Sequence, residues 1–204
     1  MTAKDGREPK APAMKPAHSK GLQSLRNHFL IATPALAQGF FAKTVTYLCE
    51  HSEEGAMGLV INQPLPVSFA DLFASLELPL EEQNTQQKVF AGGPVNTEHG
   101  FILHSPEGQW ESSLAINEDF SLTTSRDVLA AIGAGDGPKK YLIALGYAGW
   151  GPGQLEQEVS GNSWLTVPAD RGILFHVDAG DKLAAAGRQL GINIDLLTAQ
   201  AGHA

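Results

Sequence analysis

The stretch Tyr141-Leu142-Ile143-Ala144-Leu145-Gly146-Tyr147-Ala148 decides the fold, because it is nearly continuous in apolar residues. A strand that is covered on both faces has this pattern, so we expect the central strand of a sheet here. The strand leads directly into Gly149-Trp150-Gly151-Pro152-Gly153. Binding and catalytic residues lie disproportionately on loops that a rigid scaffold positions. We therefore expect a functional surface at the end of the central strand.

Strand and helix patterns are interleaved on both sides of this segment. β-branched and aromatic residues predict strands at 44–51 and 57–62, joined as an antiparallel hairpin. Ser68 and Ser125 are placed as N-caps of two helices. Further strands are expected at 89–91, 101–104, 164–167 and 172–177, one or two helical turns at 155–159, and a last helix at 181–190.

Several of these strand pairs have connections that are too short for a parallel crossover. We therefore predict an α+β fold with a curved mixed β-sheet and helices around it. Residues 21–204 contain no internal repeat and no second linker, so a single domain is expected there. Residues 1–20 hold five basic and two acidic side chains and three prolines, and are expected to form a disordered basic tail.

Composition restricts the class of protein. The chain of 204 residues is 43% hydrophobic and 18% charged, which is typical of a globular protein. No apolar run approaches the ~20 residues of a membrane span, and the N-terminal region lacks the apolar segment of a secretory signal. Cys49 is the single cysteine, which excludes an intrachain disulfide and favours a reducing compartment. A cytoplasmic location without membrane contact is predicted.

Charge argues against nucleic acid as the partner of the ordered domain. The formal net charge of -8 opposes long-range attraction to DNA or RNA, and no pattern is typical of a basic recognition helix. DNA binding through the basic tail remains a third possibility, and it predicts a strong dependence on salt.

A set of segments shares its order and spacing with one family. These segments are Cys49-Glu50-His51, residues 54–62, Gly92-Gly93-Pro94-Val95, residues 146–156, Asn162-Ser163-Trp164-Leu165 and Ala201-Gly202-His203-Ala204. From about Leu25 to its end the chain resembles the YqgE/AlgH family of bacterial proteins. The resemblance implies a cytosolic α/β domain whose sheet folds towards a barrel and, through the name AlgH, a link to regulation of alginate synthesis. It brings no catalytic residues, and Leu183 stands near a position where members commonly have tryptophan.

The glycine-rich run does not match the known phosphate-binding motifs. A Walker loop needs lysine where Pro152 follows Gly151, and a dinucleotide fingerprint needs glycine where Gln154 stands. Glu156 and Glu158 would also place negative charge close to a bound phosphate. Three interpretations stay open: ligand binding, contact with a partner protein through Trp150, and a structural tight turn.

Cys49 and His51 are two residues apart on a predicted strand, so their side chains are expected on the same face. A nearby imidazolium lowers the pKa of a thiol, which would suit a redox sensor or a nucleophile. The alternative is that Cys49 is a small buried hydrophobic residue. The seven histidines show no metal-ligand spacing, and no nucleophile elbow is present, so neither a metal nor a cofactor is expected.

The leading hypothesis is a non-catalytic regulatory or adaptor protein that binds an unknown protein or small ligand at its glycine-rich loops. The residues assigned to that surface are Gly92, Gly93, Pro94, Gly146, Gly149, Trp150, Gly151, Pro152 and Gly153. The alternative is a thiol redox sensor or enzyme centred on Cys49 and His51.

Overall fold

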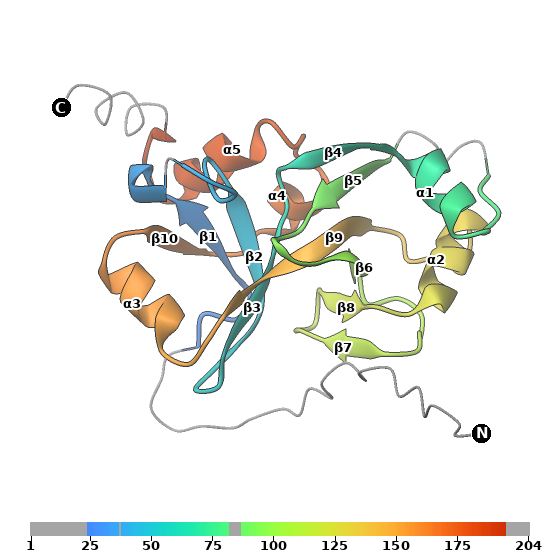
Figure 1. Cartoon of the computed structure of the whole chain (residues 1–204), viewed down its shortest axis with the longest axis horizontal. Helices are drawn as coiled ribbons and strands as arrows, with labels where there is room; N and C mark the ends of the chain where they lie inside the picture. The colour runs from blue at the N-terminus through green and yellow to red at the C-terminus, as the bar shows by residue number, and fades with distance from the viewer. Residues whose placement is uncertain (1–23, 37, 82–86, 195–204) are drawn as a thin grey trace, which may run out of the picture.

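The computed structural model describes residues 24–36, 38–81 and 87–194. Figure 1 shows a curled sheet with helices packed around it. The elements in chain order are β1 (His28–Ala32), the 3-10 helix η1 (Pro34–Leu36), β2 (Val45–Ser52), β3 (Gly55–Val60), β4 (Pro64–Ser68), α1 (Phe69–Ser75), β5 (Lys88–Ala91), β6 (Val95–His104), β7 (Ser113–Ala115), β8 (Ser121–Thr123), α2 (Arg126–Gly133), β9 (Tyr141–Trp150), α3 (Gln154–Ser160), β10 (Trp164–Pro168), α4 (Arg171–Phe175) and α5 (Lys182–Gln189). The tail at 1–20 and much of the loop expected after Glu81 lie outside the described residues.

Strand β9 is the centre of the sheet, as the apolar stretch predicts. Its partners along its length are β3, β6 and β5, and the strand order is β10-β1-β2-β3-β9-β6-β8-β7 with β5 and β4 to the side. The pair β5–β9 is parallel, whereas the other described pairs are antiparallel. The predicted α+β fold with a curved mixed sheet is confirmed, and the sheet curls into a half-barrel.

The two faces of β9 contact different parts of the core. Leu142 and Ala144 belong to the largest apolar cluster, which also contains residues of α4 and α5. Ile143, between them in sequence, packs with the helices α1 and α2. At the far end of the strand, Ala148 and Trp150 pack with α3 and β10. Figure 1 shows α3 at the opposite end of the molecule from α1 and α2. A strand buried on both faces must be apolar at consecutive positions, and this is why its sequence does not alternate.

Local signals predicted several helices and the first hairpin correctly. Strands β2 and β3 pair antiparallel, and α1 begins after Ser68, whose hydroxyl accepts a hydrogen bond from the backbone N–H of Asp71. Helix α2 likewise begins after Ser125, although that side chain makes no capping bond to the helix backbone. Pro64 and Pro66 lie in β4, which among the described strands pairs only with β5 and is therefore an edge strand, where a residue without a backbone N–H is tolerated.

The strand predicted at 172–177 is wrong, because these residues lie largely in the helix α4. A short apolar run does not distinguish a strand from a buried helical turn. Asp170 is the N-cap that favours the helix, because its carboxylate accepts a hydrogen bond from the backbone N–H of Ile173. Ile173 and Leu174 are then buried against the sheet.

Candidate functional site

The glycines singled out from the sequence divide into a buried group and an exposed group. Gly92, Gly93 and Gly146 are buried where the segment after β5 crosses β9. A Cβ on Gly93 would lie 1.9 Å from the carbonyl carbon of Tyr147, and one on Gly92 would lie 2.3 Å from the Gly146 oxygen. Gly146 also has a φ of 73°, which favours glycine. These three glycines permit two backbones to touch, which is a structural role.

Trp150 is buried as well, with 6% of its surface exposed. Its indole Nε1 donates a hydrogen bond to Oε2 of Glu158 at 2.9 Å, and Trp164 donates to the same oxygen at 2.7 Å. Phe41 packs against both indoles. Of the three interpretations that the sequence left open, direct contact with a partner through Trp150 is therefore not supported, because the side chain is packed in the core.

The network around Glu158 extends to the exposed loop before α3. Its other oxygen, Oε1, accepts a hydrogen bond from Gln154 Nε2 at 2.9 Å. Gln154 in turn accepts a hydrogen bond from the backbone N–H of Gly151 at 3.1 Å. A chain of hydrogen bonds thus connects the two buried indoles to the loop 151–153, so the loop conformation is fixed by the core beneath it.

The exposed members of the predicted surface are Pro94, Gly149, Gly151, Pro152 and Gly153. Gly149 is exposed near the end of β9, and residues 151–153 form the turn that leads into α3. Gly153 caps that helix with a φ of 73° and without a side chain. The loop lines neither of the two pockets found against α5. It therefore offers an outward surface rather than a wall of those cavities.

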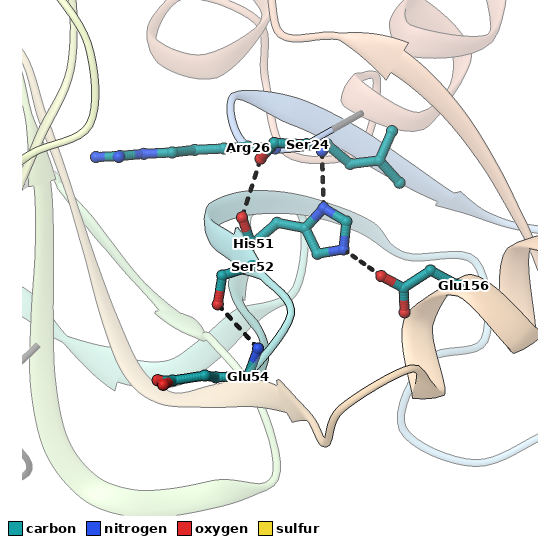
Figure 2. A network of polar contacts seen from close by, with 7 residues as sticks. Ser24, Arg26, His51, Ser52, Glu54 and Glu156 are labelled. Atoms are coloured by element: carbon teal, nitrogen blue, oxygen red, sulfur yellow. Dashed lines mark hydrogen bonds and ion pairs between the residues drawn. The ribbon is translucent and has the colours of Figure 1, made fainter. Parts of the chain in front are cut away.

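His51 joins three segments in a polar network at the same end of the molecule (Figure 2). Its Nδ1 accepts a hydrogen bond from the backbone N–H of Leu25 at 2.8 Å. The proton of the neutral ring must then be on Nε2, which lies 2.8 Å from Oε1 of Glu156 and donates to it. The carbonyl of His51 accepts from the hydroxyl of Ser24 at 3.0 Å. The two ring nitrogens and the backbone carbonyl of His51 therefore hold residues 24–25 and α3 against β2.

Cys49 and His51 do not share a face, contrary to the prediction. Leu48 pairs with Gly58, but Glu50 pairs with Met57, so Cys49 is the extra residue of a β-bulge. Cys49 therefore faces the largest apolar cluster. His51 points to the other side of the sheet, towards Glu156 in Figure 2. A bulge breaks the two-residue alternation on which the prediction rested.

The environment of Cys49 does not favour a reactive thiolate. The residue is fully buried, and burial is the largest cause of a raised pKa for its thiol. The described residues also contain no group of three or more His, Cys, Asp or Glu side chains that could hold a metal ion. No helix among them has the length and apolar character to cross a membrane.

Lys182 is a site residue that the sequence did not predict. It is the first residue of α5, is 3% exposed, and lines a pocket between that helix, α4 and the strands β5 and β9. Lysine in the first turn of a helix normally lies in solvent, so composition and periodicity gave no signal. The only indication was the apolar sequence on both sides of it, in α4 and in the alanines at 184–186.

Comparison with known proteins places this geometry in a family. The sequence model described as AlgH-like matches residues 29–195. The chain belongs to the AlgH-like family. A UPF0301 protein from Saccharophagus degradans is 54% identical to this AlgH-like chain over 181 residues, which cover 89% of each protein. A UPF0301 protein from Cupriavidus metallidurans is 52% identical over 189 residues, covering 92% of this chain and all of the relative.

Two solved structures share the fold of this AlgH-like chain. The solution structure of the AlgH protein from Pseudomonas aeruginosa is 49% identical, with a TM-score of 0.73, and the match covers 92% of this chain and 100% of that one. The crystal structure of a protein from Corynebacterium diphtheriae has a TM-score of 0.67 at 19% identity, covering 89% and 94%. The second likeness shows the fold alone. Function has to be argued from the sites themselves, because one fold supports many functions.

Proposed function

We propose that the chain is a non-catalytic regulatory or adaptor protein that binds a partner protein at the exposed loop formed by Gly149 and residues 151–153. The observation that carries the proposal is the hydrogen-bond network that fixes the conformation of this loop. Glu158 joins the buried indoles of Trp150 and Trp164 to Gln154, which holds the backbone of Gly151. A loop whose shape is set before binding loses little conformational entropy when a partner docks.

The chemistry of the surrounding side chains favours binding over catalysis. Glu158 accepts three hydrogen bonds from neighbouring side chains, and the proton on His51 Nε2 is engaged by Glu156. A general base or nucleophile needs a lone pair or proton that faces a substrate. Here the titratable groups closest to the loop are used to hold the structure together. What the loop presents to the outside is backbone and the ring of Pro152.

A protein is the better-supported partner. A small ligand gains most of its affinity from a concave site, whereas the loop residues are exposed and line neither pocket against α5. Exposed loops on a rigid scaffold are a common means of contacting other proteins. Gly92, Gly93 and Gly146 lie at the crossing of two backbones, and exposed Pro94 follows that crossing in the chain.

The test uses two matched substitutions, Gly151→Arg and Gly180→Arg. Both glycines are exposed and have no positive φ, and the nearest atom to an added Cβ is 3.9 Å away at Gly151 and beyond 4 Å at Gly180. Both variants should therefore fold, as circular dichroism and thermal unfolding would verify. A photoreactive residue at Pro152 is expected to form a specific crosslinked adduct in cells. Gly151→Arg should abolish that adduct and Gly180→Arg should leave it.

A photoreactive residue at a second position, Pro66, is the control for nonspecific adducts. Pro66 is exposed in the edge strand β4, away from the glycine-rich loop. If the same adducts form at Pro66 and Pro152, or if folded Gly151→Arg gives the wild-type adduct, the loop is not the binding surface and the proposal is wrong.

A further inference from the structure

A pocket of about 180 Å³ lies where α4 and α5 pack against β5 and β9. Seven of the twelve residues that line it are apolar, and they include Phe90, Leu142, Leu174, Phe175 and Val177, whereas polar groups line the rest. An apolar cavity of about 150 Å³ is large enough for benzene. This pocket therefore has room for a small molecule somewhat larger than a benzene ring, and it is separate from the glycine-rich loop.

Lys182 places a cation beside these apolar side chains. Its Nζ donates a hydrogen bond to the backbone oxygen of Leu174 at 2.8 Å and lies 5.2 Å from the centre of the Phe90 ring. Because Leu174 and Phe90 both line the pocket, Nζ lies at the pocket wall between them. An ammonium has three N–H donors. Among the described residues one of them has a hydrogen-bond acceptor, so two remain for a molecule in the pocket.

The position of Lys182 is costly for the folded protein. Burial is the main cause that lowers the pKa of the Lys182 ammonium to about 8, and the charge of Asp178 opposes this shift. Lysine at the first residue of α5 also meets the positive end of the helix dipole. At neutral pH the group nevertheless remains mostly protonated. A buried ammonium with unused donors is stabilised when an anion binds beside it.

The other charged groups on the wall define the charge of the expected ligand. Lys88 and Asp178 line the pocket together with Lys182, so the wall carries one net positive charge. Tyr141 is the remaining titratable group there, and burial raises the pKa of its hydroxyl, which keeps it neutral. A monoanion balances this wall. A dianion such as phosphate would be left with uncompensated charge against aromatic rings.

We propose that this pocket binds a small monocarboxylate with an apolar body, whose carboxylate pairs with Nζ of Lys182 while its body packs against Phe90, Leu142 and Phe175. The two free N–H donors match the two oxygens of a carboxylate. The apolar side chains of the wall match a short aliphatic chain or an aromatic ring. This inference does not depend on the partner-binding function of the glycine-rich loop, because the two surfaces share no residue.

The probes for the test are benzoate, phenylacetate and hexanoate, with benzamide as a neutral control of the same shape as benzoate. Binding to the full chain is followed by the shifts of backbone amide signals in NMR titrations. At least one carboxylate should shift the amides of Phe90, Leu174 and Lys182 while leaving Gly151 unchanged, and benzamide should bind more weakly than benzoate.

Two matched variants show whether Lys182 is responsible. Lys182→Met keeps the length of the side chain and removes the charge, so it should weaken carboxylate binding roughly ten- to a hundred-fold. Lys139→Met removes an exposed charge outside the pocket and should leave binding unchanged. The proposal is overturned if none of the three carboxylates binds at millimolar concentration. It is equally overturned if folded Lys182→Met binds as tightly as the wild type.

Discussion

Two regions of the molecule place a charged side chain against aromatic rings, and they differ in how its hydrogen-bonding capacity is used. Glu158 accepts hydrogen bonds from Trp150, Trp164 and Gln154, so both of its oxygens have partners within the chain. Lys182 is more deeply buried, yet it donates a single hydrogen bond, to Leu174, among the described residues. The first charge is fully used by the fold, and the second is left partly available.

The difference indicates where function should be sought. A charge whose partners are all supplied by the chain stabilises one conformation, which here is the conformation of the loop above it. A charge that is buried with partners missing carries a free-energy cost that a ligand can relieve. The glycine-rich loop is therefore proposed as a rigid contact surface, and the Lys182 pocket as a site for a small anion.

Cys49 is a further buried polar group, and it lies outside the pockets. The largest effect we expect is on the rate at which a thiol reagent labels it. Its thiol is fully buried and lines neither pocket against α5. A thiol reagent can then reach it only when the structure opens. We expect labelling of native Cys49 to be at least about a thousand-fold slower than labelling of the urea-unfolded chain. Reaction with a chromogenic disulfide measures both rates.

The labelling rate of Cys49 also tests the redox-sensor alternative. A native rate close to the unfolded rate would mean that Cys49 is accessible and would restore that alternative. A slow rate that rises in step with added denaturant would show that the thiol reacts through unfolding, as a core residue does.

Replacing Glu158 should have the next largest effect, a loss of stability, because this carboxylate is the charged group whose hydrogen bonds are all made within the chain. Glu158→Ala leaves the indole N–H groups of Trp150 and Trp164 buried without an acceptor. An unsatisfied buried donor costs about 1–3 kcal/mol. We therefore expect a loss of about 3 kcal/mol in the free energy of unfolding, measured by urea denaturation with tryptophan fluorescence as the probe.

Gln157→Ala is the control for this change, since Gln157 is exposed on the same helix. It should alter the free energy of unfolding by no more than about 0.5 kcal/mol. If Glu158→Ala were as mild as Gln157→Ala, the carboxylate would not hold the loop, and the contrast between the two charged groups would disappear.

The sequence predicted the centre of the fold well and the sites less well, for physical reasons. The apolar stretch of β9 predicted a strand buried on both faces correctly, because such a strand is apolar at consecutive positions. Ser68 marks the start of α1 through a capping hydrogen bond that does not depend on the rest of the chain, and α2 begins after Ser125 without such a bond. These signals act within a few residues, where sequence and structure are most directly related.

What the sequence could not show depends on contacts between distant segments. The bulge at Cys49 is defined by the register of β2 on β3, so strand alternation placed Cys49 and His51 on one face wrongly. Trp150 is exposed or buried according to whether Phe41, Trp164 and α3 cover it. Lys182 is buried where α4 packs beside α5, with Leu174 of α4 accepting the hydrogen bond of its amine and Phe90 of β5 beside it.

The smallest expected effect concerns stability at Lys182, and its sign is opposite to that at Glu158. Lys182→Met removes a buried charge and loses one hydrogen bond and the contact with the Phe90 ring. Replacing a poorly compensated buried charge by an apolar side chain of similar length is often neutral or stabilising. We expect the variant to be more stable than the wild type by about 1 kcal/mol at pH 7 in urea denaturation.

The pH dependence of this difference identifies its cause. The pKa of Lys182 is lowered in the folded protein from 10.5 to about 8, so the unfolded chain binds more protons than the folded one between these values. The wild type should therefore gain stability relative to Lys182→Met as the pH rises from 8 towards 10.5, and the advantage of the variant should disappear. If Lys182→Met is instead less stable at pH 7, the bond to Leu174 outweighs the cost of burying the charge. The ammonium would then act as a structural cap of α4, and the contrast with Glu158 would be lost.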